Sequence, residues 1–83
     1  MKIGDIVYYV DKEMQFYFDL KIVDIVKDKV YDVLLYKCKI LGNKYKFLNN
    51  QFKFYNDRIG EISTYSRLNL CKTLEEAEKI INN

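Results

Sequence analysis

The chain has 83 residues, of which 49% are hydrophobic and 31% are charged, and its formal net charge is +2. This composition excludes a disordered chain and a membrane protein, and the length suits one hydrophobic core. The sequence contains no His, Pro or Trp and only two Cys, so it lacks most of the residues that build catalytic and metal sites. We therefore expect one soluble domain, residues 1–83, that is not an enzyme and binds no metal or cofactor.

Alternating apolar residues predict strands in the first part of the chain. Gly4-Asp5 is a turn signal before a strand at residues 6–10. Apolar residues then occupy alternate positions: Phe16, Phe18, Leu20 and Ile22. The phase slips by one residue at Val23, which predicts a β-bulge or a sharp bend. A charged turn is expected at residues 27–29.

The strongest local signal is Gly42-Asn43, which has the chemistry of a two-residue hairpin turn of type II′. It predicts a hairpin whose first strand covers residues 30–41. This turn places Ile40 opposite Tyr45 and Lys39 opposite Lys46, and every apolar pair then falls on one side of the hairpin.

The last third of the chain combines short strands with one helix. A short strand is expected around Phe52 and Phe54, and a last one within residues 62–70, with Leu68 and Leu70 facing inward. At Thr73 the period changes from two to that of a helix.

The start of the helix has the form of a capping box, Thr73-Leu74-Glu75-Glu76. In such a box the Thr73 hydroxyl accepts a hydrogen bond from the Glu76 amide, and the Glu76 carboxylate reaches back to the Thr73 amide. We expect a helix over about 74–82, with Leu74, Ala77 and Ile81 on one face.

Five to six short strands, over about 3–70, and one C-terminal helix predict a mainly β fold. We expect a small bent antiparallel sheet or an SH3-like barrel. The segments Lys-Ile-Gly-Asp-Ile-Val-Tyr-Tyr-Val-Asp at 2–11 and Cys-Lys-Thr-Leu-Glu-Glu-Ala-Glu-Lys-Ile at 71–80 resemble the two ends of short uncharacterised bacterial and phage proteins with SH3-like barrels. The resemblance covers only the ends and implies the fold alone. With two unpaired Cys and no leader segment, we expect the cytoplasm of a bacterial host.

Basic residues are concentrated in one segment, 37–58, where Asp57 is the only acid. The predicted hairpin puts four lysines on one side: Lys37, Lys39, Lys44 and Lys46. Like charges opposite each other repel unless an anion or an acidic partner lies between them. The lysines therefore either bind an anionic partner or form a solvated face that protects an edge strand.

Large apolar residues occur on both faces of several strands, more than one small core can cover. Either the C-terminal helix or a partner covers the remainder, and Tyr is enriched at protein interfaces. The aromatics expected at such a contact are Tyr9, Tyr17 and Tyr55.

We expect a small binding protein, encoded by a phage or a mobile element, that contacts another protein in the manner of an anti-CRISPR-like inhibitor of a host defence nuclease. One alternative is a small β-barrel that binds nucleic acid through the basic hairpin. The other is a structural homo-oligomer, the simplest form being a homodimer.

Overall fold

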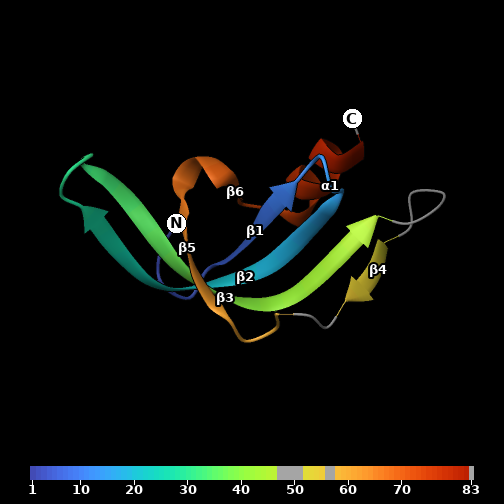
Figure 1. The fold of residues 1–83 in the computed structure, drawn as a ribbon, viewed down its shortest axis with the longest axis horizontal. Helices are drawn as coiled ribbons and strands as arrows, with labels where there is room; N and C mark the ends of the chain where they lie inside the picture. Colours follow the sequence, from blue (N-terminus) through green and yellow to red (C-terminus); the bar gives the residue numbers. More distant parts are fainter. Residues whose placement is uncertain (47–51, 56–57, 83) are drawn as a thin grey trace.

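The computed structural model describes residues 1–46, 52–55 and 58–82, with the side chains of 45–46 and 52–55 left outside the description. Within these residues, antiparallel strands form one bent, open sheet, followed by a C-terminal helix (Figure 1). The strands are β1 (Ile6–Asp11), β2 (Phe16–Asp28), β3 (Val33–Lys46), β4 (Phe52–Tyr55), β5 (Ile62–Ser66) and β6 (Leu70–Cys71). The helix is α1 (Leu74–Asn82), and a 3-10 turn, η2 (Arg67–Asn69), joins β5 to β6. The predicted mainly β fold with a C-terminal helix is confirmed.

The strands follow the order β4-β3-β2-β1-β6, and β5 also pairs with β3. β4 pairs with residues 43–46 of β3 and β5 pairs with residues 35–39, so the two short strands share one edge of the long strand. After β5, η2 leads the chain to β6, which pairs with β1 on the other side of β2. A three-residue link can join these distant strands only because the sheet is strongly bent.

Two β-bulges produce part of this bend. On β2, Ile22 pairs with Cys38 and Asp24 pairs with Lys37, which leaves Val23 without a partner. The phase slip predicted at Val23 is therefore confirmed. The register shifts a second time where Asp19 pairs with Gly42 and Leu20 pairs with Ile40, which leaves Leu41 of β3 without a partner. Bulges of this kind increase the local twist and bend the strand that carries them.

The predicted hairpin turn at Gly42-Asn43 is wrong. β3 continues through both residues, and Gly42 pairs with Asp19 while Asn43 pairs with Phe18. The 13 residues of β2 offer a long partner strand, and this non-local pairing outweighs the local turn signal. Gly42 marks the bulge instead, as a strand glycine often does.

The turn between β2 and β3 lies at residues 29–32, after the predicted charged turn at 27–29. β2 runs through Asp28, whose carboxylate accepts hydrogen bonds from the amides of Val30 and Tyr31 at 2.8 and 3.2 Å. This side-chain bonding to the following amides fixes the start of the turn.

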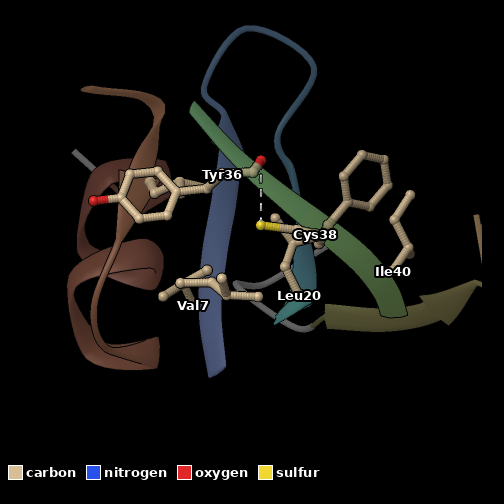
Figure 2. Packing of buried hydrophobic residues seen from close by; sticks show 8 residues of the cluster. Val7, Leu20, Tyr36, Cys38 and Ile40 are labelled. Atoms are coloured by element: carbon tan, nitrogen blue, oxygen red, sulfur yellow. Dashed lines mark hydrogen bonds between the residues drawn. The ribbon is translucent and has the colours of Figure 1, made fainter. Parts of the chain in front are cut away.

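One face of the sheet, called the core face, carries the hydrophobic core. Its buried residues come from β1, β2, β3 and β6, and Figure 2 shows how they pack together. They are Val7, Phe18, Leu20, Ile22, Tyr36, Cys38, Ile40 and Leu70. Leu70 is buried as predicted, whereas Leu68 lies in η2 and is 95% exposed, so its predicted inward position is wrong.

The helix covers part of the opposite face, called the outer face, which carries Tyr8 and Tyr17. These tyrosines alternate along β1 and β2 with core-face residues. α1 packs against β1 and buries Ala77 and Ile81. The helix thus covers one part of the apolar surplus that the sequence shows on the outer face.

The predicted cap of α1 is half correct. The Thr73 hydroxyl accepts a hydrogen bond from the Glu76 amide at 3.1 Å, as expected. The Glu76 carboxylate accepts a hydrogen bond from the Lys72 amide at 3.2 Å, in place of the bond expected from the Thr73 amide. The carboxylate still lies at the helix N-terminus, where the helix dipole favours it.

Candidate interaction surface

A row of four paired residues crosses the part of the outer face that the helix leaves open. Lys21 of β2 pairs with Lys39 of β3, Ile6 of β1 pairs with Lys21, and Ile62 of β5 pairs with Lys39. All four side chains are exposed, Ile6 by 44% and Ile62 by 60%. We call this arrangement the Ile6–Lys21–Lys39–Ile62 row.

The two lysines of the row repel each other. Directly opposed residues of an antiparallel pair have Cβ atoms about 4.5–5.5 Å apart, and like charges at that spacing are destabilising. Among the described side chains, no carboxylate lies within ion-pair distance of Lys21 or Lys39. The row therefore presents two positive charges that the described part of the chain does not neutralise.

Lys37 lies on the same exposed face, in the neighbouring row. It pairs with Asp24 of β2 and with Thr64 of β5. The Asp24 carboxylate accepts a hydrogen bond from the Ile25 amide at 2.8 Å, which holds a negative charge on this strand. Lys37 thus lies opposite an acidic residue, whereas Lys21 and Lys39 lie opposite each other.

Lys44 is engaged within the chain. Its ammonium nitrogen lies 3.9 Å from an Asp19 carboxylate oxygen and 5.7 Å from the centre of the Tyr17 ring. A carboxylate and an aromatic face both stabilise the cation, so Lys44 is less available to a partner.

The predicted pairing of Lys39 with Lys46 is wrong. Lys39 pairs with Lys21 and Ile62, and Lys46 pairs with Phe52 of β4. The side chain of Lys46 lies outside the described residues. Lys39 does lie opposite another lysine, but that residue is Lys21 of β2.

The predicted contact aromatics differ in their placement. Tyr17 is 1% exposed, so its expected role at an interface is wrong. Its hydroxyl hydrogen-bonds Glu78 of α1, and burial, followed by the charge of Asp19, raises the pKa of Tyr17. The helix buries this ring because β2 turns it toward the outer face, beneath α1.

Tyr9 is half-buried beside the core face. Its ring stacks on Phe18 at 5.9 Å between centroids and contacts Tyr65 at 5.2 Å. A ring enclosed between two others has little surface left for a partner. The side chain of Tyr55 lies outside the described residues.

Sequence reasoning missed Lys21, Ile6 and Ile62. Alternation with buried Leu20 and Ile22 already places Lys21 on a polar face. Its position opposite Lys39 could not be found, because it depends on the pairing of β2 with β3.

A second exposed surface lies between η2 and the start of β3. It is a groove of about 350 Å³, and Leu68 stands at its side, 95% exposed. The groove is lined by Val33, Leu34, Tyr36, Ser66, Arg67 and Leu68.

Both thiols are in environments that disfavour the reactive thiolate. Cys38 is fully buried, its thiol lies 3.7 Å from the carbonyl oxygen of Tyr36 (Figure 2), and burial raises its pKa to about 11. Cys71 is half-buried, and burial also raises its pKa. A thiol is a poor nucleophile until it loses its proton, so neither Cys is activated for attack on a substrate.

Among the described residues, no three His, Cys, Asp or Glu side chains gather as a metal site would require. In the same part of the chain, no helix has both the length and the apolar character needed to cross a bilayer.

Comparison with known proteins finds no matching family model, no significantly similar curated protein and no significantly similar solved structure.

Proposed function

We propose that the protein is a non-enzymatic binding protein whose outer face binds an acidic and partly apolar surface of another protein. The observation that carries this proposal is the Ile6–Lys21–Lys39–Ile62 row, in which two opposed lysines lie between two exposed isoleucines. A partner that brings carboxylates to Lys21 and Lys39 relieves their repulsion. Its apolar groups remove the isoleucines from water.

A protein partner fits the row better than nucleic acid does. Proteins that bind single strands stack bases on exposed aromatic rings, and proteins that bind duplexes present many cations to the phosphates. Neither of the two described tyrosines expected at a contact surface offers such a ring, because Tyr17 is buried beneath the helix and Tyr9 lies between Phe18 and Tyr65. The net charge of +2 is small for a phosphate-binding surface.

Within this class, we propose occlusion of a bacterial host protein, with a defence nuclease as the first partner to test. This role is proposed by analogy, from the phage or mobile-element origin that the small size of the chain and the resemblance of its two ends to short bacterial and phage proteins suggest. Occlusion needs only a complementary surface, which agrees with the absence of His from the chain.

A charge-reversal experiment tests the proposed surface. The variant Lys21→Glu/Lys39→Glu reverses both charges of the row, and Lys12→Glu/Lys29→Glu makes the same change of net charge at two exposed turn residues. The wild type and both variants are immobilised, exposed to bacterial lysate at physiological salt, and their captured proteins are compared by quantitative mass spectrometry. We expect acidic proteins captured by the wild type and the turn variant to be lost with the row variant.

Equal capture by the row variant would refute the proposed surface. A gel-shift with single- and double-stranded oligonucleotides runs in parallel. A shift by the wild type that weakens with salt and disappears in the row variant would assign the surface to nucleic acid instead.

A further inference from the structure

Within the described part of the chain, β5 is an unprotected edge of the sheet. It pairs with β3 on one side, and no other strand of the described residues pairs with it. In an antiparallel pair, hydrogen bonds to the partner alternate along the strand, so every second residue of β5 directs its backbone N–H and C=O outward. Such a row of unpaired groups is a template for another strand.

The sequence of β5 lacks the features that normally prevent edge pairing. The strand reads Ile-Ser-Thr-Tyr-Ser, with neither a charged residue nor Pro. Natural edges are commonly protected by charges, above all by Lys, or by Pro and bulges. β6, at another edge of the sheet, has only two residues, which is too short a template.

We propose that β5 pairs with β5 of a second copy of this chain, antiparallel and around a two-fold axis at Thr64. The five residues overlap their own copy completely in only one symmetric register, which places Thr64 opposite Thr64 and Ile62 opposite Ser66 of the second copy. Two threonines facing each other across antiparallel strands form a favourable pair. The sheets of the two copies thereby become one continuous sheet.

Charges next to the strand select the same register. Glu61 precedes β5 and Arg67 follows it, and both are exposed. Within its own chain Glu61 pairs with Arg58 at 2.6 Å, and the Arg67 guanidinium donates a hydrogen bond to the Leu70 carbonyl oxygen at 3.1 Å. With Thr64 on the axis, Glu61 of each copy comes to the same end of the strand pair as Arg67 of the other, so the opposite charges add an attraction across the axis. A shift of the axis to Ser63 or Tyr65 removes this attraction and leaves only three residues of overlap.

The interface is small, so the dimer is weak. A pairing of two five-residue strands falls below the roughly 1,200 Å² that stable complexes bury. We expect a dissociation constant on the order of 10 to 1,000 µM, which corresponds to about −4 to −7 kcal/mol. The dimer shares Ile62 with the row but does not involve the row lysines, so changes at Lys21 and Lys39 separate this inference from the proposed function.

Sedimentation equilibrium over a concentration range that brackets this constant tests the dimer. In Thr64→Glu, the new carboxylate lies opposite Lys37 of the same chain, and this opposite-charge pair favours the folded monomer. In the dimer the same carboxylate lies opposite the carboxylate of the second copy, and the two negative charges repel. Thr64→Val keeps a β-branched residue and serves as the matched control. We expect the wild type and Thr64→Val to dimerise, and Thr64→Glu to dimerise at least tenfold more weakly at an unchanged or higher melting temperature.

A charge swap tests the register. Glu61→Arg alone places cations opposite each other and should weaken the dimer, and Glu61→Arg/Arg67→Glu should restore it. A wild type that stays monomeric at every concentration would overturn the proposal, as would equal dimerisation by Thr64→Glu. Failure of the swap to restore the dimer would overturn the register. The Lys21→Glu/Lys39→Glu variant should dimerise as the wild type does, which separates this test from that of the proposed function.

Discussion

Lys21 on β2 and Lys39 on β3 lie directly opposite each other, with both side chains exposed. A folded chain gains nothing from such a pair, because the two charges repel across the strands. The free protein therefore retains a small electrostatic cost at the centre of its open outer face. A bound acidic surface converts that cost into attraction.

The repulsion between Lys21 and Lys39 predicts the result of a double-mutant cycle on the free energy of unfolding. Replacing either lysine alone, as Lys21→Glu or Lys39→Glu, creates an opposite-charge pair and should raise the free energy of unfolding by about 0.5–1 kcal/mol. For a domain of this size, that is a rise in melting temperature of about 2–8 °C. The double variant recreates a like-charge pair and should return to the wild-type value. Thermal unfolding followed by circular dichroism measures all four proteins, and additive effects of the two single changes would contradict direct coupling.

Local patterns predicted the elements that depend on neighbours in sequence. The alternation in β2, the slip at Val23 and the cap hydroxyl of Thr73 are each determined within a few residues. Backbone period and capping chemistry act at that range, so the sequence displays them directly.

Pairing between distant strands decided the rest. Gly42-Asn43 has suitable residues for a tight turn, but β2 extends far enough to pair with both of them. Because of this pairing, Lys39 lies opposite Lys21 and not opposite Lys46. The docking of α1 likewise buries Tyr17. The candidate surface was therefore only partly predictable, because its members come from four strands.

The hydroxyl of Tyr17 should contribute to the docking of α1. It hydrogen-bonds Glu78, and Tyr17→Phe removes this bond while keeping the buried ring. We expect a loss of about 1 kcal/mol in the free energy of unfolding and faster hydrogen exchange in α1. Tyr31→Phe, at a residue that is 76% exposed, is the control and should change neither quantity. Unchanged exchange in α1 of Tyr17→Phe would show that the hydrogen bond does not hold the helix.

The protein should lose stability in alkaline solution. Burial raises the pKa of Cys38 from its ordinary 9.0 to about 11, and burial also raises the pKa of Tyr17. The folded state therefore keeps protons that the unfolded state has already released, so the free energy of unfolding falls as pH rises. For Cys38 the loss begins near pH 9 and levels off near pH 11.

Urea unfolding at a series of pH values measures this dependence. Cys38→Ala should lower stability at every pH because it leaves a small cavity, but its curve should fall less between pH 9 and 11. An equally steep decline in the variant would exclude Cys38 as the cause.

Two residues with positive φ should respond in opposite directions to exchange with glycine. Gly60 has a φ of 91°, and a Cβ added there would meet no atom within 4 Å, so Gly60→Ala introduces backbone strain without a clash. We expect a loss of about 1–2 kcal/mol in the free energy of unfolding, since left-handed backbone costs an L-residue roughly that much.

Gln15, in the turn after β1, has a φ of 57°. Gln15→Gly removes the same strain and should raise the free energy of unfolding by up to about 1 kcal/mol, less the entropy that glycine adds to the unfolded chain. Chemical denaturation of both variants provides the comparison, and a stabilised Gly60→Ala or a clearly destabilised Gln15→Gly would contradict the turn geometry.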